Sequence, residues 1–182
     1  GDEDVHKAFL ASISEGIRFV DTAEVYGSGR SERLLGEFLK QTEQPILVAT
    51  KYAPYPWRFG KNALVRALKA SLERLGVESV DLYQIHFPGI TMSTDTLMEG
   101  LAECVKSGMT RTVGVSNFGQ TRMLAAYSAL ARQNIPLASN QVHYSLLSRE
   151  VEKNGTLARC KELGIRLIAY SPLEKGLLSG KY

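Results

Sequence analysis

The sequence predicts an α/β fold built on a parallel sheet, and three observations support this prediction. Short segments rich in apolar and β-branched residues recur at intervals of about 25 to 35 residues, beginning near Ile17, Ile46, Val80, Thr112, Leu137 and Arg166. Segments with helical periodicity lie between them, as in a repeated strand–helix unit. The strand segments are almost wholly apolar, which is typical of a sheet that is covered on both faces.

The predicted helices have apolar residues that recur every three or four positions. Gly76, Gly108 and Gly164 lie just beyond three of these helices, where glycine commonly ends a helix. Strand–helix–strand units of this kind join parallel strands by right-handed crossovers. The expected helices cover residues 5–13, 34–39, 63–75, 97–105, 124–130 and 157–163.

The turn after the first predicted strand distinguishes two kinds of parallel fold. A doubly wound sheet usually carries a glycine-rich phosphate turn at this point. The segment Gly27-Ser28-Gly29-Arg30-Ser31-Glu32 begins like such a turn, but Glu32 stands where the third glycine belongs. This difference favours a (β/α)8 barrel. Such a barrel takes about 250 residues, so we expect residues 1–182 to be a single domain that forms part of one.

Composition and charge exclude several classes of function. The net charge is +3 and the 22 Lys and Arg residues are scattered, so no nucleic-acid partner is expected. No apolar run approaches the roughly 18 residues that a membrane helix needs. Cys104 and Cys160 lie in separate helices, and two cysteines make neither a metal site nor a disulfide framework. We expect reduced, partly buried thiols and a reducing compartment, either the cytoplasm or, in a photosynthetic eukaryote, the plastid stroma.

Four residues with complementary chemistry follow three successive predicted strands. Asp21 and Tyr26 lie in the segment Asp-Thr-Ala-Glu-Val-Tyr-Gly, Lys51 ends the next strand, and His86 ends the one after it. The carboxyl ends of parallel barrel strands meet on one face, where active sites form. A free phenol has a pKa of about 10, and a nearby cation lowers the pKa of a phenol toward neutrality. The sequence therefore predicts an acid–base site with Tyr26 as proton donor.

Each of these residues also has an ordinary structural interpretation. Alone, Tyr26 is typical of a half-buried loop aromatic, Lys51 of a solvated strand end, Asp21 of a turn or helix cap, and His86 of a hydrogen-bonding histidine. Their joint placement at strand ends favours one site. In that site Asp21 holds the Lys51 ammonium, and Lys51 stabilises the phenolate form of Tyr26. His86 donates a hydrogen bond to a substrate carbonyl oxygen. None of the four can deliver a hydride, so reduction requires a cofactor.

Five motifs in order resemble those of the aldo-keto reductases. They are Asp-Thr-Ala-Glu-Val-Tyr-Gly at 21–27, Ala-Thr-Lys at 49–51, Asp-Leu-Tyr-Gln-Ile-His at 81–86, Gly-Val-Ser-Asn-Phe at 114–118 and Ala-Tyr-Ser-Pro-Leu at 169–173. The resemblance runs from about residue 5 to the end and is greatest to the bacterial and plastid branch. It implies a barrel that reduces aldehydes or ketones with NADPH. Compared with the complete barrel of this family, this chain is expected to supply strands two to seven and to lack the first strand and the eighth unit.

The resemblance also assigns residues to the cofactor and the substrate. It implies that Ser116, Asn117 and Gln141 bind the nicotinamide amide, that Tyr170 stacks on the nicotinamide ring, and that the segment after the last strand carries the pyrophosphate, through Ser171, Pro172, Leu173, Gly176, Leu177 and Lys181. Glu174 departs from the small or neutral residue usual there and places a negative charge in that segment. The family's adenosine 2′-phosphate site lies in the missing eighth unit, so NADP is expected from the resemblance alone.

The substrate residues and two other functions remain open at this point. Tyr55, Trp57 and Phe87 either line the substrate mouth, together with Arg58, or belong to a packed loop. Potassium-channel β subunits share the fold and many of these motifs as cofactor-binding regulatory proteins, but commonly lack a histidine at the position of His86. A truncated, inactive form is the third alternative, because strands near Ile17 and Arg166 would leave unpaired edges that associate with other chains. The oligomeric state is not predicted.

Overall fold

A computed structural model of the chain describes residues 1–181 and shows six parallel strands in one sheet. The strands follow one another in space in the same order as in the sequence, so each is hydrogen-bonded to its sequence neighbour. All six predicted strands are confirmed. They are β1 (Phe19–Asp21), β2 (Leu47–Tyr52), β3 (Val80–Ile85), β4 (Thr110–Ser116), β5 (Leu137–His143) and β6 (Arg166–Tyr170).

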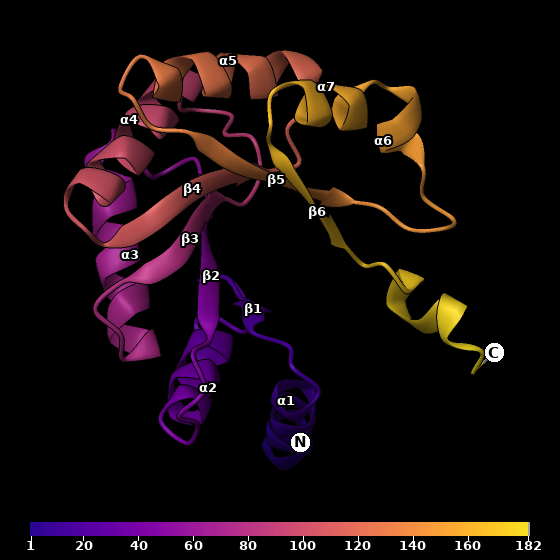
Figure 1. Ribbon diagram of the computed structural model, residues 1–182. Coiled ribbons are helices and arrows are strands. Elements are labelled where there is room, and N and C mark those ends of the chain that lie inside the picture. The colour runs from indigo at the N-terminus through magenta and orange to yellow at the C-terminus, as the bar shows by residue number, and fades with distance from the viewer. Residues whose placement is uncertain (182) are drawn as a thin grey trace.

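The helices pack on the outer side of the curled sheet (Figure 1). All six predicted helices are present, with bounds α1 (Asp2–Ser14), α2 (Arg30–Leu39), α3 (Asn62–Leu75), α4 (Thr94–Lys106), α5 (Gln120–Ala131) and α7 (Thr156–Glu162). Two short elements were not predicted, namely α6 (Glu150–Lys153) and the 3-10 helix η1 (Glu174–Ser179). Both lie in segments that follow β5 or β6.

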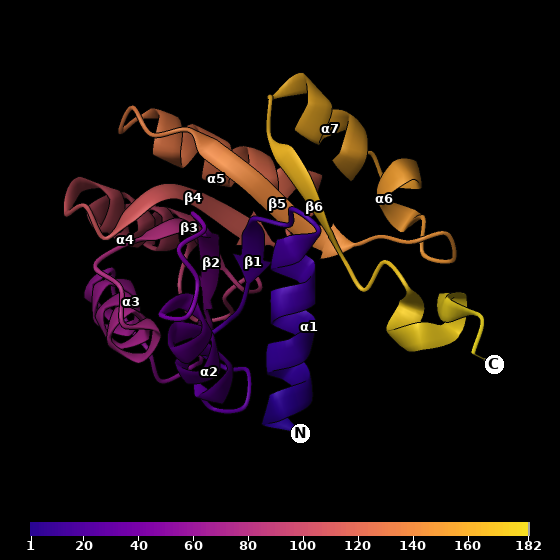
Figure 2. The same cartoon turned by 60° about the horizontal axis from the view of Figure 1, so that its bottom comes forward.

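The six strands form an incomplete parallel barrel, as the sequence predicts. Within the described residues, β1 pairs with β2 alone and β6 pairs with β5 alone. Figure 1 shows the sheet curling so that β1 and β6 lie on either side of an open side. Figure 2 shows α1 running alongside β1. The apolar side chains Phe19 and Leu47 at the β1 side of the sheet are 39% and 45% exposed, as expected for a sheet that lacks a neighbour there.

The hydrophobic core lies between the sheet and helices α3, α4 and α5. The stripe predicted along residues 63–75 is buried against β2 and β3, with Leu64 and Leu68 fully inaccessible. Close approach of α2 and α3 requires glycine at position 36, because a Cβ there would lie 2.5 Å from the backbone oxygen of Leu75. No helix in residues 1–181 is both long enough and apolar enough to cross a membrane.

Two polar details of the sequence find a structural role inside the fold. Glu32 belongs to α2, is fully buried, and accepts hydrogen bonds from Thr50 Oγ1 and Arg74 Nε, each at 2.6 Å. The Gly27–Glu32 segment is therefore a turn followed by the first residues of α2, a helix that is anchored to its neighbours. The two cysteines are unpaired and fully buried, rather than partly buried as expected. Burial raises the pKa of the Cys104 thiol to about 12, so this thiol stays protonated.

Candidate active site

Buried Lys51 forms an ion pair with the partly exposed Asp21 at the carboxyl ends of β1 and β2. The Lys51 side chain is fully inaccessible, and its Nζ donates to Asp21 Oδ2 at 2.5 Å and to the Thr22 backbone oxygen at 2.7 Å. The other carboxylate oxygen of Asp21 accepts from Gln84 Nε2 at 3.3 Å. A buried ammonium needs hydrogen-bond partners for its protons. Asp21 and the Thr22 oxygen accept two of them, and the remaining proton is left for the Tyr26 oxygen.

Tyr26 lies on the loop after β1, beside this ion pair. Its phenol oxygen is 3.4 Å from Lys51 Nζ, and the ring centroid is 4.8 Å from the same nitrogen. The Tyr26 side chain is 40% exposed, whereas Lys51 is not exposed at all. The arrangement therefore places a phenol at the surface with a fixed, buried cation behind it. Such a phenol can meet a ligand on its open side while the ammonium stabilises negative charge on its oxygen.

His86 follows β3 and faces the phenol. Its backbone nitrogen donates to the Tyr52 oxygen at 2.8 Å, and its ring meets the Tyr26 ring edge-on at 5.6 Å. Burial lowers the pKa of His86 to about 4, with a smaller contribution from the Lys51 charge that the Asp21 carboxylate opposes. The imidazole is therefore neutral near pH 7 and carries one N–H. Its Nδ1 is buried without a hydrogen-bond partner among the described residues.

Glu24 and Arg58 hold the loops around Tyr26, and sequence reasoning assigned no such role to either. Glu24 Oε1 accepts from the Ala53 backbone nitrogen at 2.7 Å and from Arg58 Nη1 at 2.5 Å, and Oε2 accepts from Nη2 at 3.1 Å. Arg58, which the sequence places either at the substrate mouth or in a packed loop, ties the loop after β2 to the loop that carries Tyr26. Burial disfavours its charge, but the hydrogen bonds and charge of Glu24 raise the pKa of Arg58.

The aromatic residues assigned to the substrate gather beside His86. Tyr55 and Trp57 stack with ring centroids 4.7 Å apart, and Phe87 approaches Tyr55 edge-on at 6.5 Å. Phe87 also lies 5.7 Å from the His86 ring. The Trp57 side chain is 70% exposed. These rings form an open aromatic wall next to the histidine, although they lie on two different loops.

Ser116, Asn117 and Gln141 are brought together at the ends of β4 and β5. Ser116 pairs in register with Gln141, and its Oγ donates to the Gln141 backbone oxygen at 2.9 Å. Asn117 has a left-handed backbone, with φ of 62°. Its Nδ2 donates to Ser116 Oγ at 3.1 Å and to the His86 backbone oxygen at 3.2 Å. Asn117 therefore joins the strand ends to the loop of His86, and its amide protons are engaged.

Tyr170 ends β6 and extends this set. Its hydroxyl donates to Asn117 Oδ1 at 3.0 Å, and its ring stacks on His143 with centroids 5.3 Å apart and planes 8° apart. The Tyr170 side chain is 37% exposed. The structure gives the buried side-chain amide of Gln141 no hydrogen bond to any residue from 1 to 181. An accessible aromatic ring and an uncommitted amide thus lie at neighbouring strand ends.

The segment after β6 is placed apart from the buried ion pair. Its residues Leu173 and Leu177 are 57% and 63% exposed, and Lys181 is also exposed. The carboxylate of Glu174, by contrast, turns back toward the loop after β5, where it contacts Ser145 and His143. The remaining residues that the resemblance assigned to the pyrophosphate, Ser171, Pro172 and Gly176, lie on the same segment.

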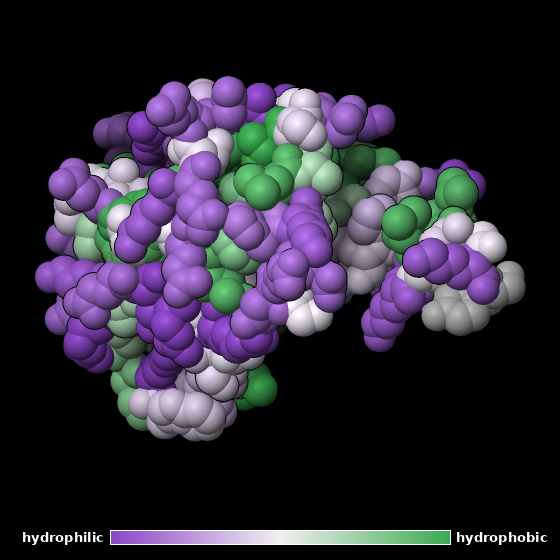
Figure 3. Space-filling view, turned by 90° about the horizontal axis from the view of Figure 1, so that it is seen from below, coloured by the Kyte–Doolittle hydropathy of each residue, from purple (hydrophilic) through white to green (hydrophobic). Residues whose placement is uncertain are grey.

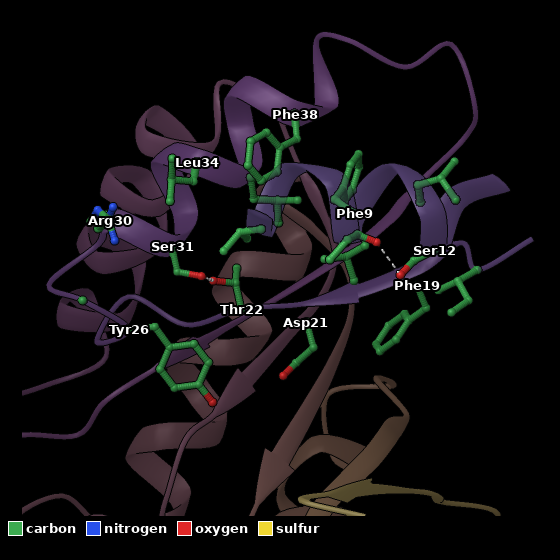
Figure 4. A pocket seen from close by; sticks show the side chains of 17 residues that line it. Phe9, Ser12, Phe19, Asp21, Thr22, Tyr26, Arg30, Ser31, Leu34 and Phe38 are labelled. Atoms are coloured by element: carbon green, nitrogen blue, oxygen red, sulfur yellow. Dashed lines mark hydrogen bonds between the residues drawn. The ribbon is translucent and has the colours of Figure 1, made fainter. Parts of the chain in front are cut away.

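A cavity of about 600 Å³ lies beside the ion pair, between α1, α2 and β1. Figure 4 shows that Phe9, Leu34 and Phe38 line one side, while the Asp21 carboxyl and the Tyr26 hydroxyl lie away from them at its edge. The cavity is mainly apolar and follows the unpaired edge of β1. The cavity therefore results from the open edge of the sheet. The Asp21 carboxyl and the Tyr26 hydroxyl lie at its border and do not fill it.

An incomplete parallel barrel with an Asp–Lys–Tyr–His cluster at its strand ends defines the class of site. Comparison with known proteins gives the family: residues 2–182 match the model of the Aldo/keto reductase family. Pyridoxal reductase, chloroplastic, of Arabidopsis thaliana is 40% identical over 194 aligned positions, which cover 100% of this chain and 53% of that protein. The chain belongs to the aldo/keto reductase family.

Two solved structures of similar fold were also found. A thermostable aldo-keto reductase in complex with the inhibitor epalrestat is 34% identical with a TM-score of 0.89, covering 99% of this chain and 64% of that one. The aldo-keto reductase from Klebsiella pneumoniae in complex with NADPH is 29% identical with a TM-score of 0.85, covering 98% and 61%. The chain thus spans about half the length of its curated relative.

Proposed function

We propose that these residues form the catalytic face of an NADPH-dependent carbonyl reductase that converts aldehydes or ketones to alcohols. One observation carries the proposal: the inaccessible Lys51 ammonium lies 2.5 Å from Asp21 and 3.4 Å from the exposed phenol of Tyr26. The geometry supplies a proton donor whose conjugate base is stabilised in advance. Because the chain spans about half of its curated relative, the proposal concerns the full-length gene product.

The residues at the ends of β4, β5 and β6 fit a nicotinamide cofactor. The Gln141 amide is buried and uncommitted, so it can pair with a carboxamide, while Asn117 and Ser116 hold the backbone around it. Tyr170 offers an accessible ring for stacking. NADPH, when bound, supplies the two-electron reduction of the carbonyl carbon. The NADPH complex of the Klebsiella relative supports this choice of cofactor.

The remaining steps belong to the cluster around Tyr26. The neutral His86 imidazole donates a hydrogen bond to the carbonyl oxygen and orients it beside the phenol. Tyr26 then transfers its proton to that oxygen as negative charge develops there. Lys51, held by Asp21 and the Thr22 oxygen, stabilises the resulting phenolate. Glu24 and Arg58 keep the Tyr26 loop fixed against the loop after β2.

The substrate proposed is a flat aromatic or apolar aldehyde or ketone. Tyr55, Trp57 and Phe87 present an exposed aromatic wall beside His86, which favours planar ligands. Pyridoxal, the compound in the name of the Arabidopsis relative, is a flat aromatic aldehyde. The aromatic wall fits flat aromatic aldehydes as a class, and it does not distinguish one such aldehyde from another.

Steady-state turnover tests the proposal against the regulatory alternative. The full-length gene product is mixed with NADPH and a substituted benzaldehyde, and the loss of NADPH absorbance is followed. Multiple turnovers per protein are the expected result. Tight NADPH binding with a single slow turnover would instead indicate a cofactor-binding regulatory subunit, and it would reject the reductase. An intact-mass measurement of the natural protein establishes which chain length is tested.

A further inference from the structure

The Glu174 carboxylate bridges two loops at the cofactor side of the site. It belongs to η1, after β6, and its side chain is only 16% exposed. It accepts a hydrogen bond from the hydroxyl of Ser145, in the loop after β5, and its Oε1 lies 2.9 Å from His143 Nε2. The charge that the sequence places in this segment is therefore directed toward the neighbouring loop.

The hydrogen bond from Ser145 has a fixed direction. Ser145 Oγ accepts from the backbone nitrogens of Leu147 at 3.1 Å and Ser148 at 2.9 Å. These two bonds occupy the oxygen's lone pairs and leave its single proton for Glu174. A carboxylate, which can only accept, is the complementary partner. The loop after β5 is thus built to offer one donor at this point.

The contact continues from Glu174 to the catalytic side. His143 stacks on Tyr170, Tyr170 donates to Asn117, and Asn117 donates to the His86 backbone oxygen. The other ring nitrogen of His143 lies 3.3 Å from Ser148 Oγ, so both ends of the ring have neighbours. Glu174 is therefore the outer end of a continuous chain of contacts that holds the Tyr170 ring.

The backbone of the segment after β6 has an unfavourable conformation that contacts with another element must stabilise. Ser171, Glu174 and Lys175 adopt left-handed conformations with φ of 52°, 47° and 54°, which are unfavourable for residues with a Cβ. The other hydrogen bonds that the structure describes for residues 173–179, such as Ser179 Oγ to the Gly176 oxygen, close within the segment. Within the part of the chain described, the side chain of Glu174 makes the polar contacts from η1 to another element.

We propose that Glu174 is a positioning residue that fastens the segment after β6 to the loop after β5, so that the segment and Tyr170 are shaped for the cofactor before it binds. Its carboxylate accepts from the Ser145 hydroxyl and faces the His143 ring, so its charge is directed toward the loop after β5. This inference rests on the proposed function for the identity of the cofactor. The fastening itself is a property of the cofactor-free protein.

Two variants of Glu174 separate fastening from charge repulsion. Glu174→Gln and Glu174→Ala remove the same charge, but only Gln keeps an oxygen that can accept from Ser145. In fluorescence titrations of the full-length gene product with NADPH, we expect Ala to raise Kd about tenfold, the order of one hydrogen bond to a charged group, and Gln to raise it less. An unchanged Kd in both variants, or equally tighter binding in both, would overturn the inference.

Further measurements distinguish positioning from general damage. The KM for the carbonyl substrate should stay within about twofold of wild type in Glu174→Ala, because the aromatic wall is untouched. Glu162→Gln is the matched control: it removes a charge that pairs with Arg159 on α7 and should change neither constant. A rise in carbonyl KM equal to the rise in NADPH Kd would reject a specific role for Glu174.

Hydrogen exchange tests the fastening without any cofactor. Amides of residues 173–180 should exchange faster in Glu174→Ala and in Ser145→Ala than in wild type, and the double variant should add little to either. Unchanged exchange in both variants would overturn the fastening even if wild type binds NADPH. Failure of wild type to bind NADPH would overturn the proposed function and the cofactor role of Glu174 with it, while faster exchange would still establish the fastening.

Discussion

The strand ends of β1–β3 and those of β4–β6 are built from different kinds of side chain. The first group is held by charges: Lys51 with Asp21, and Glu24 with Arg58, in contacts that are largely withdrawn from water. The second group is held by neutral amides and hydroxyls around Asn117. A buried charge needs a partner, and both Lys51 and Glu24 have an oppositely charged side chain in contact. The second group leaves an amide and a ring open to a ligand.

The outermost part of the second group is also the least supported. Figure 3 shows the C-terminal segment projecting from the main body of the molecule. Leu173 and Leu177 are exposed, and Glu174 supplies the segment's polar contacts to the loop after β5. Under the proposed function, residues of β1–β3 prepare proton transfer, whereas contacts at β4–β6 bind the cofactor.

Replacement of the proposed proton donor tests this division with the largest expected effect. Tyr26→Phe keeps the ring beside Lys51 and removes the hydroxyl. The turnover number for carbonyl reduction should fall by about 10² to 10⁴, the usual contribution of a general acid, while the Kd for NADPH stays within about twofold of wild type. Turnover near the wild-type value would remove Tyr26 from this role. A large rise in Kd would show that the two groups of strand ends are not separate.

A buried ion pair should also contribute more to stability than an exposed one, and the pair between Glu32 of α2 and Arg74 of α3 is the buried case. Glu32→Gln removes the charge that Arg74 pairs with and leaves a buried amide beside Thr50. We expect a loss of about 2 to 3 kcal/mol in the free energy of unfolding, somewhat below the range for fully buried pairs because Arg74 is 23% exposed. Urea denaturation of the full-length gene product measures it. Glu162→Gln, on exposed α7, should cost less than about 0.5 kcal/mol, and equal losses would contradict the comparison.

The pH dependence of activity reports the neutral state of His86. Its pKa is lowered from 6.5 to about 4, so the imidazole stays uncharged as pH falls through the usual range of histidine titration. The profile of kcat/KM should therefore show no acidic limb centred near pH 6.5. Since the unfolded chain binds this proton more readily, neutral His86 contributes stability that is fully present above pH 6.5 and is lost as pH falls toward 4. A limb near 6.5 that vanishes in His86→Gln would contradict this assignment.

The sequence predicted the parts of this molecule that depend on local pattern. The six strands and the order of Asp21, Tyr26, Lys51 and His86 at their ends follow from apolar segments and short motifs, because strand ends in a parallel barrel converge wherever the strands are found. The Glu24–Arg58 pair was missed because its members lie 34 positions apart on different loops. The sequence signal available for this pair was an acidic residue, Glu24, two positions before Tyr26.

The segment after β6 was the part least open to prediction. Its path depends on left-handed residues that are not glycine, Glu174 and Lys175, and no local propensity indicates such a backbone. The direction of the Glu174 side chain depends in turn on Ser145, 29 positions away. The family resemblance identified Glu174 as a departure from the usual small or neutral residue, but only the arrangement of the two loops shows that its carboxylate faces Ser145.

The smallest expected effect tests whether the two groups of strand ends act independently. Tyr170→Phe keeps the stack on His143 and removes the hydrogen bond to Asn117, so the Kd for NADPH should rise about three- to fivefold, the value of one neutral hydrogen bond. Turnover with saturating NADPH should change less than twofold, as estimated for a residue that acts on binding alone. Combined with Tyr26→Phe, the effects on kcat/KM should multiply within about a factor of two. A larger deviation would show that Asn117, which also binds the His86 backbone oxygen, transmits the change at Tyr170 to the catalytic side.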